Sequence, residues 1–224
     1  MKRKDKTIKA VGLLFLIAMF SSIAGGVLIE SILNDNDLIR KVFVNKALIR
    51  FGVFLEIINS LAVIGIAILL FPVIKEFNER TALGYFSFRL IESLFCVTSA
   101  FMPLLVINLS DEYLKASVLN YSYFDSIGKS LLVVRSEISG LMIPIFFSLG
   151  GILFYTFLYQ SKLIPGFISL WGLISVILVL SSNLFETSST IQVLLVLPII
   201  VNEIFLGGWL IVNGFKVNIT MQND

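Results

Sequence analysis

Four charged side chains, Glu56, Arg89, Glu92 and Glu203, lie inside long apolar stretches of this sequence. An ionised side chain near the centre of a bilayer costs roughly 2.5–3.5 kcal/mol on insertion scales, so four unpaired ones would cost on the order of 10–14 kcal/mol. Residues of this kind generally pair with one another, face a water-filled cavity or mark a path for ions or substrates. These four residues are therefore the first candidates for a functional site.

Helical spacing brings further polar side chains onto the same faces as these charges. Tyr85, Cys96 and Ser99 follow the three- and four-residue steps of a helix that also carries Arg89 and Glu92. The arginine and the glutamate, three residues apart, can neutralise each other along one helix. Asparagines lie within one helical turn of the charges in two other stretches. The predicted ligand- or ion-binding residues are Glu56, Asn59, Arg89, Glu92, Asn202 and Glu203.

The charges in this set do not balance. Three carboxyl groups face one guanidinium, so at least one glutamate is expected to hold a proton near neutral pH unless another cation is bound. A site coupled to protons or cations is consistent with this surplus, and so is a pocket for a substrate that carries an amine. In this interpretation Glu92 and Glu203 bind a cation or exchange a proton. Arg89 holds them or an anionic group, and Glu56 lines an outer access route.

Two other interpretations stay open. In the first, Arg89 pairs with Glu92 or Glu203 and the charges only lock the packing of helices. The chain would then be a structural or regulatory membrane protein, such as an immunity or stress-related factor. In the second, two carboxyl groups perform acid–base chemistry in an intramembrane hydrolase. An enzyme is the weaker expectation, because two intramembrane glutamates alone are a nonspecific sign of catalysis.

The composition excludes several kinds of chemistry. The chain has no histidine, which removes the commonest metal ligand and the usual general base, so no metal site and no cofactor is predicted. Cys96 is the only cysteine, and an intramolecular disulfide is therefore impossible. The net charge is +2 and no basic patch with interleaved aromatic residues occurs, which argues against nucleic acid. The predicted partners are the lipid bilayer and a small-molecule or ion ligand, and the oligomeric state is left open.

Membrane-spanning helices must position these charges. The chain is 57% hydrophobic and 14% charged, whereas a soluble domain carries about a quarter charged residues. Six apolar segments are long enough to cross a hydrocarbon core of ~30 Å. The sequence predicts an all-α polytopic integral membrane protein, a single six-helix domain over residues 1–224. Its transmembrane helices are expected at about residues 8–29, 48–74, 81–107, 138–159, 164–184 and 191–212.

The connections and termini give an orientation. Residues 31–47 mix apolar and basic side chains, which predicts a short interfacial helix. Residues 108–137 are richer in Asp, Ser, Asn and Tyr, which favours an ordered cap or a mobile loop. Five lysines and arginines fall within the first nine residues. By the positive-inside rule both termini are predicted to be cytoplasmic, in a multi-pass protein of a bacterial plasma membrane.

The depth of the charges along these helices brings two glutamates to one level. At 1.5 Å per residue, Glu92 and Glu203 both lie ~16–18 Å into their spans, close to the midplane. Arg89 lies nearer the cytoplasmic face and Glu56 nearer the outer face. We therefore expect Glu92 and Glu203 to meet in the middle of the bundle.

Five segments, taken in order, carry a resemblance to a known family: AVGLLFLIAMFSSIAGG, ALIRFGVFLEIINSLAVIGIAILLFPVIKEFN, ALGYFSFRLIESLF, YQSKLIPGFISLWGLI and VLPIIVNEIFLGGWLIVNGF. The chain resembles the bacterial multi-spanning membrane proteins of domain-of-unknown-function family 4386. The resemblance covers most of the chain outside residues 108–137, and implies a six-helix integral membrane protein without implying an activity. It implies polar motif positions at Arg50, Arg89, Glu92 and Glu203. Proteins of this type often carry a histidine before the fourth span, where this chain has Arg135-Ser136-Glu137.

Overall fold

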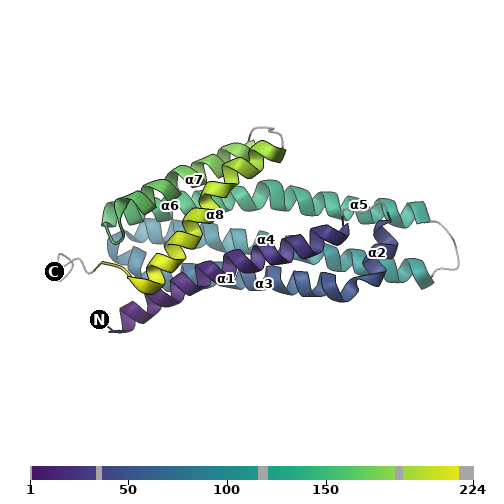
Figure 1. The fold of residues 1–224 in the computed structure, drawn as a ribbon, viewed down its shortest axis with the longest axis horizontal. Coiled ribbons are helices and arrows are strands. Elements are labelled where there is room, and N and C mark those ends of the chain that lie inside the picture. The colour runs from purple at the N-terminus through teal and green to yellow at the C-terminus, as the bar shows by residue number, and fades with distance from the viewer. Residues whose placement is uncertain (1, 34–36, 116–120, 185–188, 217–224) are drawn as a thin grey trace.

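The described part of the chain is built from helices alone. The computed structural model describes residues 2–33, 37–115, 121–184 and 189–216, and no strand occurs within these ranges (Figure 1). A π-helical segment, η1, joins two of the α-helices into one continuous rod. The elements are α1 (Lys2–Leu33), α2 (Leu38–Val44), α3 (Lys46–Phe77), α4 (Glu79–Lys115), α5 (Tyr121–Glu137), η1 (Ile138–Met142), α6 (Ile143–Ser161), α7 (Gly166–Leu184) and α8 (Ser189–Val212).

Six helical segments are long and apolar enough to cross a membrane. They confirm the predicted all-α polytopic fold with six transmembrane helices. The assignment of the whole chain to a single domain stays a prediction. The six segments are Asp5–Leu33, Lys46–Phe77, Glu79–Lys115, Tyr121–Ser161, Gly166–Asn183 and Thr190–Val212.

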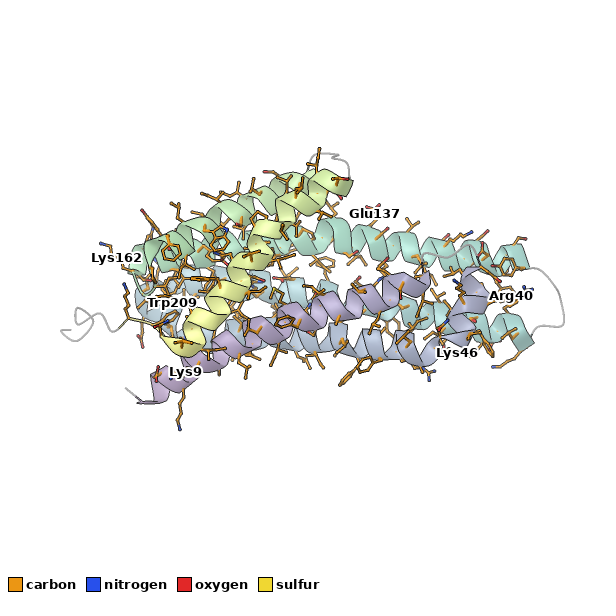
Figure 2. The ribbon with its side chains drawn as sticks, viewed as in Figure 1. Lys9, Arg40, Lys46, Glu137, Lys162 and Trp209 are labelled. Carbon is orange, nitrogen blue, oxygen red and sulfur yellow. The ribbon has the colours of Figure 1, made fainter. Side chains whose placement is uncertain are left out.

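Basic side chains mark the two ends of the bundle. Lys9 and Lys162 lie at one end, and Arg40 and Lys46 lie at the other (Figure 2). Trp209 lies at the same end as Lys9, where tryptophan is common at a membrane interface. The sides between the two ends expose large apolar residues, which is the pattern expected of a surface that faces lipid.

Two helical segments are much longer than a bilayer requires. At 1.5 Å per residue, the 37 residues of α4 extend over about 55 Å and the 41 residues from α5 through α6 over about 60 Å, against a hydrocarbon core of ~30 Å. The 19 residues of α7 extend over only about 28 Å. The bundle therefore continues beyond the level of α7 as a narrower projection that contains α2, α5 and the end of α4, together with the end of α1 and the start of α3 (Figure 1).

Much of the segment 108–137, for which an ordered cap or a mobile loop was expected, is helical. Residue Lys115 ends α4 and Tyr121 begins α5, while residues 116–120 lie outside the described part of the chain. The apolar side of α5 explains this order, because Leu131 and Leu132 pack against a buried cluster that contains Ile107. Several polar side chains of the segment are exposed, whereas Ser110 and Arg135 are buried.

The short helix predicted between the first two spans is α2. Leu38 and Val42 are buried in the same cluster as Ile29 of α1. The hydroxyl of Ser110 in α4 donates a hydrogen bond of 2.7 Å to the carbonyl oxygen of Ile39. These contacts hold α2 against α1 and α4 in the projection.

Helices α1 and α8 cross where both carry a glycine. A Cβ atom placed on Gly12 would lie 2.6 Å from the carbonyl oxygen of Gly207, and one on Gly207 would lie 3.0 Å from the carbonyl oxygen of Gly12. Small residues at such a crossing let two membrane helices approach closely. The crossing lies near the end of the bundle where α1 begins and α8 ends (Figure 1).

Gly12→Ala is expected to lower the free energy of unfolding by about 1–3 kcal/mol, because the added methyl group meets backbone that cannot rotate away. Gly26→Ala in the same helix is the matched control, since a Cβ there meets no atom of the described residues within 4 Å. The control should be unchanged or more stable by up to about 1 kcal/mol. Reversible unfolding in mixed micelles measures both. Equal effects of the two variants would contradict the close approach of α1 and α8.

Candidate functional site

A cavity of about 480 Å³ lies inside the bundle, and all six membrane-spanning segments contribute to its wall. Five of the lining residues carry charge, and the others are mostly apolar with a few serines and amides. The charged lining residues are Glu56, Arg89, Glu92, Arg135 and Glu203.

The cavity runs along the bundle axis, because the lining residues of each helix fall in one consistent order. The end of the cavity nearer the start of α1 is called its inner end, and the opposite end its outer end. The inner end contains Phe15 of α1, Arg89 of α4 and Glu203 of α8. The outer end contains Glu56 of α3 and Gln192 of α8. The 11-residue separation from Gln192 to Glu203 along α8 corresponds to a length of about 16 Å. The cavity thus spans much of one half of a bilayer.

Arg89 and Glu92 form a buried ion pair at the inner end. The guanidinium Nη1 donates to Oε2 of Glu92 at 2.9 Å and to Oε1 at 3.1 Å. The same guanidinium lies 5.1 Å from the ring centroid of Phe147 and 5.6 Å from that of Tyr85, within cation–π range. Sequence spacing predicted this pairing along one helix. The Nε atom of Arg89 has no hydrogen-bond partner among the described residues.

Glu203 reaches the same cavity from α8. Its carboxylate makes no hydrogen bond and no ion pair with any residue that the structure describes, although it lies close enough to Arg89 and Glu92 to interact electrostatically with both. The amide of Asn59 also lines the cavity. The inner end therefore combines one neutralised pair with one carboxyl group that faces open space.

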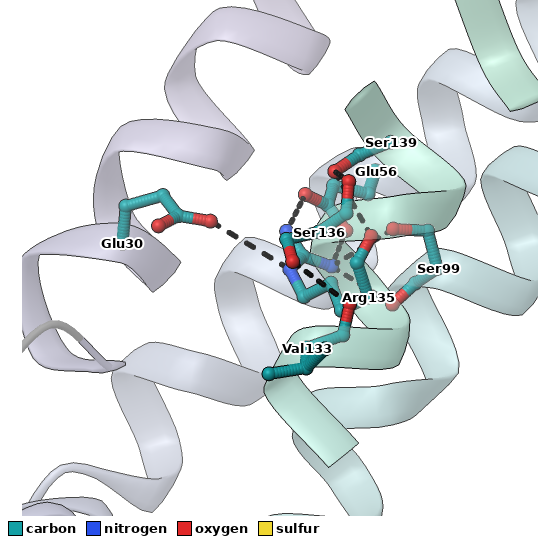
Figure 3. Close-up of polar contacts among 7 residues, drawn as sticks. All are labelled: Glu30, Glu56, Ser99, Val133, Arg135, Ser136 and Ser139. Carbon is teal, nitrogen blue, oxygen red and sulfur yellow. Dashed lines mark hydrogen bonds and ion pairs between the residues drawn. The ribbon is translucent and has the colours of Figure 1, made fainter. Parts of the chain in front are cut away.

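Arg135 organises the outer end of the cavity (Figure 3). Its Nη2 atom lies 2.5 Å from Oε1 of Glu56, and its Nη1 atom donates to Oε2 of the same carboxylate at 3.0 Å. Nη1 also donates to the carbonyl oxygen of Ser99 at 2.8 Å, and Nε lies 3.7 Å from Oε1 of Glu30. Only 6% of Arg135 is exposed. One guanidinium thus connects α5 with α1, α3 and α4.

Arg135 was not among the predicted site residues. The polar composition of residues 108–137 favoured an ordered cap or a mobile loop, so Arg135 was not expected in the bundle interior. The spacing did contain a signal: Gly128, Leu131 or Leu132, and Arg135 recur at three- and four-residue steps, and these residues form the inward face of α5. The pairing with Glu56, 79 residues away, has no signature in the spacing.

The π-helical segment η1 begins three residues after Arg135. The hydroxyl of Ser139 donates a hydrogen bond of 2.9 Å to the carbonyl oxygen of Arg135. Pro144 follows η1 and has no N–H to donate to the preceding turn. Ser139 and Pro144 both line the cavity. The irregular turn therefore lies against the candidate site, which is where π-helical segments are often found.

Asn202 does not line this cavity. Its Oδ1 atom accepts a hydrogen bond of 2.8 Å from the hydroxyl of Tyr155, and its Nδ2 atom donates to the carbonyl oxygen of Ile168 at 3.0 Å. Consecutive residues of a helix point about 100° apart, so Asn202 faces α6 and α7 while Glu203 faces the cavity. Sequence proximity grouped these two residues, and the helix geometry separates them. The other five predicted residues all line the cavity.

The balance of charge in the cavity differs from the predicted one. Three carboxyl groups face two guanidinium groups, because Arg135 joins Arg89. Each arginine forms bonds to one glutamate, Arg89 to Glu92 and Arg135 to Glu56. Glu203 is left as the single surplus carboxyl group among the lining residues.

Comparison with known proteins gives the family of the chain and no activity. No curated protein and no solved structure matches the chain. A family model described as Domain of unknown function (DUF4386) matches residues 10–214, which include every charged residue of the cavity and all six membrane-spanning segments apart from the first five residues of the first one. The chain therefore belongs to the DUF4386 family of integral membrane proteins.

Proposed function

We propose that this membrane protein binds a small cationic or amine-bearing molecule in the cavity between its helices. Glu203 would be the counter-ion of the ligand, with Asn59 available as a hydrogen-bonding group. Arg89 and Arg135 would hold Glu92 and Glu56 in place at the two ends of the cavity. Binding can be tested without knowing whether the ligand is transported or sensed.

The surplus carboxyl group is the observation that carries this proposal. Glu92 and Glu56 are each bonded to an arginine, whereas Glu203 has no hydrogen bond or ion pair within the described part of the chain. An ionised carboxylate is costly inside a membrane unless it is paired or solvated. A cation bound in the cavity would remove that cost, and the cavity has the size of many small-molecule sites.

A second candidate function is structural or regulatory, with the charges serving only to lock the packing of helices. The two intramolecular ion pairs favour it, because Arg89 and Arg135 use their charge within the bundle. This candidate does not account for the carboxyl group of Glu203 or for the open volume beside it. It predicts that no cation or amine binds at Glu203.

Glu203→Gln is expected to weaken binding of octylamine or of Na⁺ about 10–100-fold, because a charge-assisted contact is worth about 1.5–3 kcal/mol. Calorimetric titration of the protein in nanodiscs measures this, with the heat of empty nanodiscs subtracted. Glu137→Gln is the matched control, since Glu137 is exposed and does not line the cavity. If neither probe binds Glu203→Gln more weakly than the original chain, the binding function is wrong and the structural one is favoured.

The orientation in the membrane is also proposed. The basic residues before the first span support a cytoplasmic N-terminus in a bacterial plasma membrane. An even number of spans leads the C-terminal end of α8 to the same side as the start of α1. The projection of α2, α5 and the end of α4 would then lie outside the cell. Labelling of Arg40→Cys by a membrane-impermeant maleimide in intact cells tests this, because Cys96 is buried.

A further inference from the structure

We infer that the ligand of this cavity is an amphipathic amine that enters sideways from the lipid, between the outer halves of α1 and α8. The inference rests on the proposed binding function and names the class of ligand and its route. It is carried by the crossing of the two helices, by the exposure of the cavity rim and by the chemistry of the walls.

Helices α1 and α8 touch at Gly12 and Gly207 and separate from there toward the outer side (Figure 1). The lining residues of both helices lie on the outer side of this crossing. Ile23 is 11 residues, or about 16 Å, beyond Gly12, and Gln192 is 15 residues, or about 22 Å, before Gly207. The cavity therefore occupies the space between two diverging helices.

Exposure rises along both helices toward the outer end of the cavity. On α1, Phe15 and Met19 are buried, whereas Ile23 is 47% exposed. On α8, Ile199 is buried and Gln192 is exposed. The mouth of the cavity thus lies between Ile23 and Gln192, with the charged inner end behind it.

The outer surfaces beside this mouth are apolar. Phe20 on α1 and Val193 and Leu194 on α8 are among the most exposed large apolar side chains of the described residues, and they lie within three residues of the rim. Exposed apolar residues in membrane-spanning helices face lipid tails. The mouth therefore opens beside hydrocarbon rather than only toward water.

Part of the cavity wall between mouth and inner end is apolar as well, facing the polar part that carries the Arg135–Glu56 pair. Met19, Val63, Val196 and Ile199 line this stretch, from three different helices. A hydrated ion would pass this wall without contacts that replace its water, whereas an alkyl or aryl body would bury apolar surface there. The carboxyl group of Glu203 lies beyond this stretch and suits an ammonium group at the leading end of the ligand.

These features select one class of molecule. It carries a single positive charge at one end and an apolar body behind it, and it partitions into the membrane before it binds. A second positive charge at the far end would meet the carboxylate of Glu56 only as one already paired with Arg135, and otherwise apolar side chains or lipid tails. Octylamine represents the class, and 1,8-diaminooctane, of the same length with a charge at both ends, represents the excluded one.

The test uses the full chain in nanodiscs and four tryptophan variants. Ser22→Trp and Gln192→Trp place an indole at the rim of the mouth, and both original residues line the cavity and are exposed. Phe20→Trp and Val193→Trp place the same indole on the same helices at exposed positions that do not line the cavity. Because all four positions are exposed, the fold should tolerate each change, and the melting temperature of each variant checks this.

The rim variants are expected to weaken octylamine binding at least tenfold, while the two control variants stay within twofold of the original chain. Octylamine should also bind at least tenfold more tightly than 1,8-diaminooctane. If binding depends on Glu203 but the rim variants act like the controls, or both amines bind equally, the inference is wrong and the proposed function stands. If octylamine binding does not depend on Glu203, the inference fails, and the proposed function fails with it only when Na⁺ binding is also unchanged in Glu203→Gln.

Discussion

Arg89→Met is expected to lower the free energy of unfolding by about 3–5 kcal/mol, the usual cost of leaving one member of a buried ion pair without its partner. Arg89 and Glu92 are 4% and 3% exposed, so little water can reach the carboxylate once the guanidinium is gone. Methionine retains much of the apolar volume beside Phe147 and Tyr85, and the effect then reports mainly the lost charge. Equilibrium unfolding by sodium dodecyl sulfate in mixed micelles measures the change.

A double variant and an exposed ion pair are the controls for this prediction. Arg89→Met combined with Glu92→Leu should return to within about 1 kcal/mol of the original chain, because no charge is left unpaired. Lys75→Met removes an exposed pair with Glu79, joined at 2.9 Å, and should cost no more than about 1 kcal/mol. A loss of less than 1 kcal/mol in Arg89→Met would mean that Glu92 finds another way to be neutralised, such as a proton.

Arg135→Met is expected to lower stability by about 2–3 kcal/mol and to release α5 from the bundle. The smaller cost follows from Glu56, whose side chain is 15% exposed and can be hydrated through the mouth of the cavity. The bonds from Arg135 to Glu56 and to the carbonyl oxygen of Ser99 are lost together. Hydrogen–deuterium exchange should show faster exchange in α5, with α7 unchanged.

Two variants distinguish the role of Arg135 from a general effect of charge on α5. Lys129→Met removes the bond to Asp125 on the same helix, at 2.6 Å, and should leave exchange in α5 close to that of the original chain. Arg135→Lys keeps the charge and loses the forked geometry, so an intermediate rate is expected. If Arg135→Met and Lys129→Met exchange alike, Arg135 does not fix α5 to α3 and α4.

Sequence patterns predicted the parts of the site that lie along single helices. The steps from Tyr85 through Arg89 and Glu92 to Cys96 and Ser99 predicted one face of α4, and all five residues are buried. The six apolar segments predicted the six spans because hydropathy over about 20 residues is a strong signal. The predicted depths placed Glu92 and Glu203 at the same level on helices that run in opposite directions, and both residues line one cavity.

Residue spacing and hydropathy did not predict which side chains meet between helices. The pair of Arg135 and Glu56 joins residues in two helices with no common period, and the polar surroundings of Arg135 resemble a loop. The separation of Asn202 from Glu203 depends on how α8 is rotated against α6 and α7, which hydropathy does not specify. Rotation and contact depend on side-chain packing, and packing is a property of the assembled bundle.

The continuous rod from α5 through η1 to α6 has the geometry of a lever. Its pivot is the π-helical turn beside the cavity, and its long arm is the 17 residues of α5, about 25 Å in length. A tilt of about 5° at the pivot would displace the far end of that arm by about 2 Å, a distance that follows from the helix length alone. A change in the cavity next to Ser139 and Pro144 that tilted this turn would therefore be magnified at the far end of α5.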